Sequence, residues 1–172
     1  MTAVQETQQK SSISVAPGLI GLSHLGITVS DIAAMQKFWT QVMGFGTLIE
    51  GDDFCMLFEP SAQLAIGFTN NQGQATGPFD ERRVGLDHLG LAVADLATLT
   101  AWEQRLTESN IPHSPITASD AGHHLNLRAP ENFPVELFVL TQQGAAELGL
   151  PADTTPVAAT HQIGSQPPTR RV

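Results

Sequence analysis

The sequence predicts an α+β fold made of two similar units, each with one β-strand, one α-helix and two or three further strands. An internal repeat is the first reason: the stretch GLSHLGITVSD at 21–31 returns as GLDHLGLAVAD at 85–95. Both stretches alternate apolar with small or polar residues, which is typical of a half-buried strand. Each also ends in an aspartate followed by apolar residues at helical spacing, as the start of a helix does.

The first unit is expected to occupy 19–70. After its opening strand, Asp31 caps a helix that Gly44 ends, because glycine tolerates the left-handed conformation that closes many helices. Two strands follow at 54–58 and 63–68, separated by a Glu-Pro-Ser turn. The apolar positions of the helix are spaced for one buried face: Ile32, Met35, Phe38, Trp39 and Val42.

The second unit repeats this order over 85–142. Asp95 is expected to cap its helix. Strands are predicted at 123–128 and 135–140, and a weaker one near Ile116. The apolar positions of the helix are Leu96, Leu99, Trp102 and Leu106.

Three polar segments lie outside the two units. The linker between them, 71–84, is rich in Gly and Gln and contains a proline. The segments 1–18 and 143–172 show neither the helical nor the strand spacing of apolar residues, and we expect both to be flexible tails. The sheet of each unit would bury its free face against the sheet of the other unit. That packing gives one curved, mixed, mostly antiparallel sheet around a cup, with the helices outside.

Composition excludes several classes of function. The chain has 172 residues, a formal net charge of −9 and only eight Lys and Arg. This disfavours nucleic acid as a partner, because affinity for phosphate backbones comes mainly from basic side chains. No apolar run is long enough to span a bilayer, and the first residues lack the pattern of a secretory signal. Cys55 is the only cysteine, which fits a reducing compartment, so we expect a cytoplasmic protein.

Two histidines and one glutamate are the candidates for chemistry. His24 and His88 occupy equivalent positions of the repeat and share their strand face with small residues, which suits the floor of a cavity. Glu136 lies between Val135 and Leu137, whose alternation turns it to the same side of its sheet. A carboxylate there is costly to bury without a positive partner. Two imidazoles and a carboxylate converging in the cup predict a divalent-metal site with open coordination positions.

These stretches make the chain similar to the vicinal oxygen chelate superfamily, which includes glyoxalase I, extradiol dioxygenases, fosfomycin-resistance enzymes and bleomycin-resistance proteins. The resemblance rests on the two histidine stretches and on Pro-Val-Glu-Leu-Phe at 134–138. It implies paired βαβββ modules that enclose one divalent ion (Fe, Mn, Ni, Zn or Co), with His24, His88 and Glu136 as its ligands. The implied activity is glyoxalase- or dioxygenase-type chemistry on a small oxygen-chelating substrate, through Lewis-acid catalysis or through iron and O₂.

Two departures from the family pattern narrow this expectation. In glyoxalase I the last strand of the first module supplies a fourth ligand, and we place Ala65 in that position, which favours a three-ligand site. The chain has no tyrosine, which extradiol dioxygenases generally use beside the iron. Ring cleavage would therefore need His124 or another histidine as the acid/base group. Arg128 is the candidate for contacting a phosphonate, as in the fosfomycin-resistance enzymes.

Alternation also predicts the walls of the cup. The first unit should supply an apolar wall and the second a polar one: Phe54, Met56 and Phe58 on one side, and His124, Asn126 and Arg128 on the other. Ala65 would leave an open approach. Such a cavity suits a small molecule with an apolar body and an oxygen-bearing end.

Two simpler interpretations remain open. The paired histidines could be a relic of duplication, and the cup would then bind or sequester small molecules without metal, as the bleomycin-resistance proteins do. His124 could be a solvated residue at a strand edge rather than a catalytic one. Modules of this kind can pair within a chain or between chains, so a homodimer is one of two expected arrangements.

Overall fold

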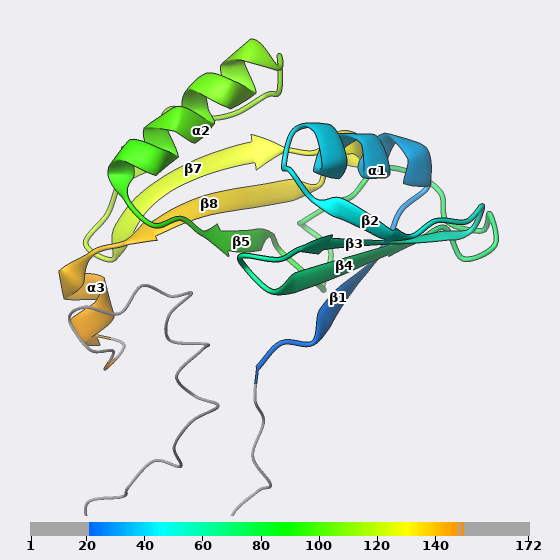
Figure 1. Ribbon diagram of the computed structural model, residues 1–172, viewed down its shortest axis with the longest axis horizontal. Helices are drawn as coiled ribbons and strands as arrows, with labels where there is room; N and C mark the ends of the chain where they lie inside the picture. The colour runs from blue at the N-terminus through cyan, green and yellow to red at the C-terminus, as the bar shows by residue number, and fades with distance from the viewer. Residues whose placement is uncertain (1–20, 148, 150–172) are drawn as a thin grey trace, which may run out of the picture.

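The computed structural model describes residues 21–147 and 149, which form two modules with the same order of elements (Figure 1). The first module consists of β1 (His24–Thr28), α1 (Ile32–Gln41), β2 (Gly46–Ile49), β3 (Phe54–Glu59) and β4 (Leu64–Thr69). The second consists of β5 (Leu89–Ala92), α2 (Leu96–Glu108), β6 (Thr117–Ala118), β7 (Gly122–Arg128), a 3₁₀ turn η1 (Pro130–Asn132) and β8 (Pro134–Leu140). Helix α3 (Gln142–Glu147) follows.

Each module forms its own four-stranded mixed sheet. The strand orders are β1-β4-β3-β2 and β5-β8-β7-β6, and the first strand of each module runs parallel to the last. The other neighbours are antiparallel. The shared topology confirms the α+β class and the paired βαβββ modules. The single curved sheet that we expected is not formed within the described chain, since β1 and β5 are both end strands and do not pair with each other.

Both aspartates predicted as helix caps do cap helices. The side chain of Asp31 accepts a hydrogen bond of 2.9 Å from Ala34 N, and that of Asp95 accepts one of 2.7 Å from Thr98 N. The hydrogen bonds from Thr98 hold the pKa of Asp95 below its ordinary value, because they stabilise the charged carboxylate. Gly44 follows α1 with φ at +84°, where glycine is favoured. The repeat therefore starts each helix directly after its histidine strand.

Alternation along the strands separates a core face from an open face. Helices α1 and α2 lie on the same side of the sheets (Figure 1). On that side Cys55, Leu57 and Leu125 are fully buried and Leu137 is 1% exposed, as the alternation predicted. Burial raises the pKa of the Cys55 thiol, because the thiolate loses its hydration there. The opposite face of each sheet, which α1 and α2 leave uncovered, carries the candidate site residues.

The second module holds α1 at both ends. The carboxylate of Glu131 in η1 accepts hydrogen bonds from Ser30 N (3.0 Å), from Ser30 Oγ (2.9 Å) and from Asp31 N at the N-terminus of the helix. Arg105 of α2 donates to carbonyl oxygens at its C-terminus, including that of Val42 at 2.7 Å. A negative group at the start and a positive group at the end both complement the helix dipole. These contacts place the modules relative to each other.

Some expected boundaries differ from the structure. Helix α3 occupies the beginning of 143–172, which we expected to be a tail, and Ala145 is only 4% exposed. Thr141 fixes this helix by donating its hydroxyl to the carbonyl of Ala121. The remainder of that segment, apart from 149, and the expected tail 1–18 lie outside the described residues. No helix in the described part of the chain is long and apolar enough to cross a membrane.

Candidate metal centre

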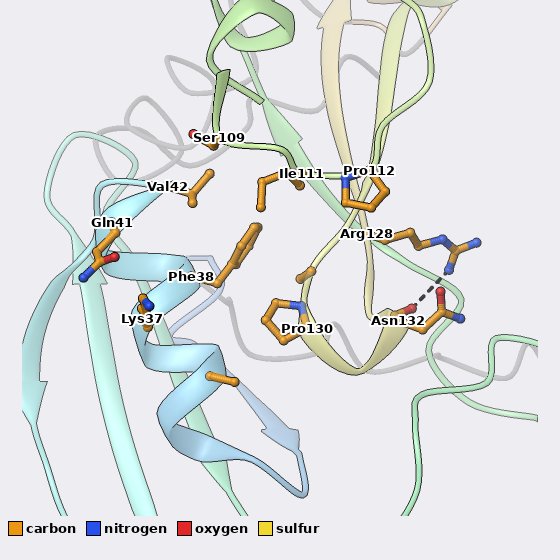
Figure 2. A pocket seen from close by; sticks show the side chains of 12 residues that line it. Lys37, Phe38, Gln41, Val42, Ser109, Ile111, Pro112, Arg128, Pro130 and Asn132 are labelled. Carbon is orange, nitrogen blue, oxygen red and sulfur yellow. Dashed lines mark hydrogen bonds between the residues drawn. The ribbon is translucent and has the colours of Figure 1, made fainter. Parts of the chain in front are cut away.

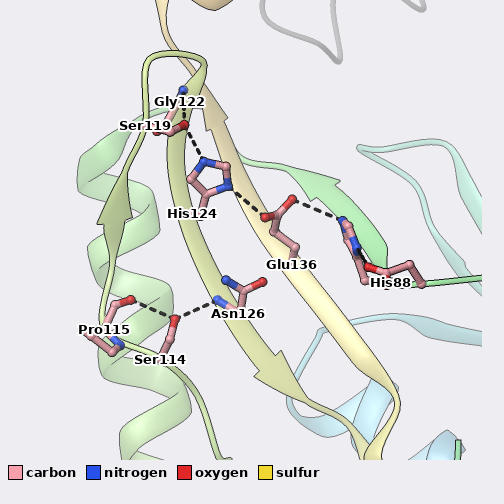
Figure 3. A network of polar contacts seen from close by, with 9 residues as sticks. His88, Ser114, Pro115, Ser119, Gly122, His124, Asn126 and Glu136 are labelled. Carbon is pink, nitrogen blue, oxygen red and sulfur yellow. Dashed lines mark hydrogen bonds and ion pairs between the residues drawn. The ribbon is translucent and has the colours of Figure 1, made fainter. Parts of the chain in front are cut away.

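Glu136 lies in the middle of β8 on the open face of the second sheet. Its neighbours Val135 and Leu137 point into the core and are each 1% exposed, so alternation turns the carboxylate away from the helices. The side chain is 19% exposed. Each of its two oxygens faces a different histidine, as Figure 3 shows. The carboxylate thus meets positive or hydrogen-bonding partners, which burial at this position requires.

His88 faces one oxygen of this carboxylate. Its Nε2 lies 3.6 Å from Glu136 Oε2, and its Nδ1 lies 2.7 Å from Asp87 Oδ2. An imidazole whose Nδ1 is held by a carboxylate offers Nε2 as a ligand, which is the usual arrangement for histidines that bind metals. His88 and Glu136 are therefore brought together in an orientation that a divalent ion could use.

His24 is oriented in the same way but lies apart from this pair. Its Nδ1 is 3.2 Å from the hydroxyl of Ser23, the residue equivalent to Asp87 in the repeat. Its Nε2 makes no hydrogen bond to the described residues, and the side chain is exposed. Within the described chain no group of three or more His, Cys, Asp or Glu side chains is arranged to hold a metal ion. One chain therefore brings together two of the three predicted ligands.

His124 contacts the other oxygen of Glu136. Its Nδ1 lies 2.8 Å from Glu136 Oε1, and its Nε2 lies 2.7 Å from the hydroxyl of Ser119. The ring also packs on Phe138, with the two centroids 4.8 Å apart. His124 therefore lies beside Glu136 on the open face of the second sheet and is held on both nitrogens.

Arg128, the other predicted catalytic residue, lies elsewhere. Its guanidinium donates to Glu81 Oε1 at 2.8 Å and to the carbonyl of Asn132 at 3.2 Å. This contact lowers the pKa of Glu81, because the cation stabilises the carboxylate. Although Arg128 shares a strand face with His124, four residues along a strand correspond to roughly 13 Å.

Arg128 instead borders a groove between the modules. The groove has a volume of about 870 Å³. In it α1 faces the loop before β6 and the turn after β7 (Figure 2). Its lining is mostly apolar, with Phe38 and Val42 opposite Ile111 and Pro112. None of the predicted metal ligands lines it. The groove and the polar cluster of His88, His124 and Glu136 are therefore separate features of the molecule.

The open face of the first sheet carries the apolar side chains that alternation placed there. Met56 and Phe58 are partly exposed on its open face, and Phe54 is 36% exposed. Ala65 pairs with His24 across β1 and β4, and it lies on the same face. From the second sheet, Asn126 is exposed opposite Glu136 in the register of β7 and β8.

The strand register corrects one equivalence between the modules. Gly90 pairs with Glu136, and the matching glycine of the first repeat, Gly26, pairs with Gly67. The counterpart of Glu136 is therefore Gly67 and not Ala65. A Cβ at Gly67 would lie 3.1 Å from Cε2 of Phe54, so the Phe54 ring fills the space of a side chain there. The first module has no carboxylate at either position.

Two residues of the site were missed from the sequence. Asp87 could have been found, because it directly precedes the histidine of the repeat and a carboxylate there can hold Nδ1. Ser119 carries no motif, since it reaches His124 only through the hairpin between β6 and β7.

Comparison with known proteins identifies the family. The sequence matches the family model described as Glyoxalase/Bleomycin resistance protein/Dioxygenase superfamily over residues 21–137, which includes both histidine stretches and Glu136. The chain belongs to this superfamily. This confirms the resemblance seen in the sequence. A search of curated proteins found no match.

Solved structures support the same fold. The glyoxylase/bleomycin resistance protein/dioxygenase domain from Frankia sp. EAN1pec is 28% identical in sequence, with a TM-score of 0.63. The match covers 72% of this chain and 99% of the Frankia chain. The fosfomycin resistance protein FosX from Listeria monocytogenes, complexed with Mn(II) and sulfate, is 15% identical, with coverages of 76% and 99% and a TM-score of 0.60. Lactoylglutathione lyase from Agrobacterium tumefaciens is 15% identical, with coverages of 69% and 92% and a TM-score of 0.57. At 15% identity the last two show the fold alone.

Proposed function

We propose that this superfamily member is a divalent-metal-dependent enzyme whose ligands are His24, His88 and Glu136. The observation that carries the proposal is the opposed pair of His88 Nε2 and Glu136 Oε2, 3.6 Å apart, with Asp87 holding the far side of the imidazole. Two atoms that each lie about 2.1 Å from one ion are roughly 3 Å apart, so a small side-chain movement would let both reach it. The donor set of imidazole and carboxylate suits Mn, Fe, Co, Ni or Zn.

A second copy of the chain is proposed to supply His24. Strand β1 begins at His24, and β5 begins one residue after His88. Both are end strands, so within the described chain each has a free edge. Leu22 and Leu86, at equivalent places just before these strands, are 66% and 42% exposed, so an apolar side chain lies beside each edge. Pairing β1 of one copy with β5 of the other, twice around a two-fold axis, would cover both edges. Each site would then take His24 from one copy and His88 with Glu136 from the other.

The proposed substrate is a small molecule with two neighbouring oxygen atoms and an apolar body. A bound divalent ion would supply Lewis-acid catalysis, or O₂ chemistry if it is iron. The apolar wall formed by Phe54, Met56 and Phe58 would bind the body of the substrate and exclude water. The amide of Asn126, beside Glu136, would donate a hydrogen bond to an oxygen of the substrate. Arg128 receives no catalytic role in this proposal, because its guanidinium is bonded to Glu81 and to the Asn132 carbonyl rather than to the residues around Glu136.

Metal analysis of the purified protein tests this proposal. The Mn(II) complex of the FosX neighbour makes Mn(II) the first ion to add. We expect about one ion per chain in the wild type and a loss of binding in His88→Ala and in Glu136→Gln. His123→Ala on the same strand as His124 and Glu108→Gln on α2 are matched controls that should bind normally. Equal metal content in the wild type and both ligand variants would rule the proposal out.

A metal-free binding protein is the second candidate function. It is favoured by the absence, in the described part of one chain, of a group of three ligands ready for a metal. Thermal unfolding with increasing Mn, Fe, Co, Ni or Zn separates the two candidates, because an ion that binds only the folded state raises the melting temperature with its concentration. A melting temperature that no ion changes would favour the binding protein.

A further inference from the structure

The His124 ring is held on both of its nitrogens and packed on one side. Its Nδ1 lies 2.8 Å from Glu136 Oε1 and its Nε2 lies 2.7 Å from Ser119 Oγ, as Figure 3 shows. The ring is further packed on Phe138. With both nitrogens occupied and one face covered, the imidazole has little freedom to turn toward a substrate.

The direction of these hydrogen bonds follows from the partners. An ionised carboxylate can only accept, so the hydrogen between His124 and Glu136 is carried by Nδ1. Ser119 Oγ meets the other nitrogen and is itself fixed in the hairpin turn, where it accepts from Gly122 N at 3.2 Å and lies 3.2 Å from the carbonyl oxygen of Gly122. The anchor of the ring is therefore the backbone of the turn between β6 and β7.

This arrangement leaves the two oxygens of Glu136 unequal. Oε1 is engaged by His124, and Oε2 is the oxygen that faces His88 Nε2. We propose that His124, anchored by Ser119, is a positioning residue that restricts Glu136 to binding a metal through Oε2 alone. This inference rests on the proposed metal-binding function. It replaces the acid/base role that the sequence suggested for His124.

The first module provides an internal comparison. In the strand register Phe54 is the counterpart of His124, and Gly67 is the counterpart of Glu136. There a phenyl ring covers a glycine, with no carboxylate for it to hold. The orienting histidine thus occurs where the carboxylate occurs, and both are missing from the other module. This is what a role in positioning Glu136 predicts, and packing alone does not require it.

The order of serine, histidine and carboxylate is also that of a hydrolytic triad. Here the serine hydroxyl is already bonded within its turn, and the carboxylate is shared with His88. Those contacts favour an anchoring role for Ser119 over a nucleophilic one. An esterase activity of the wild type towards p-nitrophenyl acetate that disappears in Ser119→Ala would overturn this part of the inference.

Mn(II) titration followed by electron paramagnetic resonance tests the positioning role. His124→Phe introduces the residue that the first module uses, and we expect its Mn(II) affinity to fall about 10- to 100-fold, as is typical when a partner of a metal ligand is lost. His124→Asn keeps an amide nitrogen near the place of Nδ1, so its affinity should stay within about 3-fold of the wild type. Ser119→Ala should lie between the two. Unchanged melting temperatures or circular dichroism spectra would show that the variants are folded.

The outcomes separate this inference from the proposed function. If the wild type binds no Mn(II), both fail. If the wild type binds and His124→Phe binds equally well, the positioning role alone is wrong. A second readout needs no metal: in a nitrogen-15 spectrum of histidine side chains, His124 should show its hydrogen on Nδ1. A His124 signal with the hydrogen only on Nε2 would contradict the proposed contact with Glu136.

Discussion

Replacing Glu131 by glutamine tests how the two modules are held together. The carboxylate accepts from three donors at the start of α1, whereas glutamine offers one oxygen and turns an amide nitrogen toward a donor. Removing a charge next to a helix N-terminus costs about 0.3–1 kcal/mol, and the hydrogen bonds lose about as much again without charge assistance. We expect Glu131→Gln to lower the free energy of unfolding by about 1–2 kcal/mol.

The backbone at Glu131 supplies an internal control. Its φ is +58°, in the left-handed region that costs a side-chain-bearing residue about 1 kcal/mol or more. Alanine and glycine both remove the carboxylate, but only glycine relieves this strain. Glu131→Gly should therefore be more stable than Glu131→Ala by about 1 kcal/mol, which separates the loss of the hydrogen bonds from the backbone conformation.

Urea denaturation followed by tryptophan fluorescence is the assay. Trp39 lies in α1 and Trp102 in α2, so each module has its own probe. With a dependence of about 1–3 kcal/mol per molar urea, the midpoint of Glu131→Gln should fall by roughly 0.3–2 M. The difference should shrink at high salt, because the group is partly exposed and its charge is screened. A midpoint equal to that of the wild type at low salt would refute the role of Glu131 in holding the modules.

Three further predictions concern stability and reactivity. Gly122→Ala should lower the free energy of unfolding by about 3 kcal/mol or more, measured by heat or urea, because the added Cβ would lie 2.2 Å from the Val139 carbonyl oxygen. Gly46→Ala is the control: its Cβ would meet only ordinary contacts, so the free energy of unfolding should change by less than about 0.5 kcal/mol. Asp95→Ala should be less stable than the wild type at pH 7. The difference should shrink as the pH falls through the lowered pKa of the Asp95 carboxyl, because a protonated Asp95 no longer caps α2 as an anion. A difference in stability that stays constant down to pH 2 would contradict this. Cys55 should react with Ellman's reagent at least about 100-fold more slowly in the folded protein than in urea, because its thiol is buried and its pKa is raised; equal rates would contradict the burial.

Local patterns in the sequence were sufficient to predict the elements of the two modules. The repeat, the capping aspartates Asp31 and Asp95 and strict alternation around Leu125 and Leu137 each depend on neighbours in the chain, and the structure follows them. Contacts between distant segments were not accessible in this way. Glu131 reaches the start of α1 across about a hundred positions, and no motif marks a residue for such a contact.

For the candidate site, the sequence predicted which strand face the side chains lie on but not which of them contact one another. Alternation turned Glu136 and His124 to the open face, but it could not show that they bond to each other, because that depends on the register of β7 and β8. The same limitation led to Ala65 as the counterpart of Glu136, when the register gives Gly67. Both positions lie on one face, and a shift of two residues leaves the alternation unchanged.

A complementation experiment tests most directly whether two copies form the metal site. His24→Ala and Glu136→Gln chains would be co-expressed, and the Mn(II) sites of the purified mixture counted by electron paramagnetic resonance. Neither variant alone should hold a complete site. Random pairing gives mixed dimers in about half of the molecules, each with one intact site, so the mixture should recover about a quarter of the wild-type number. A mixture with no more sites than the separate variants would contradict a site shared between copies.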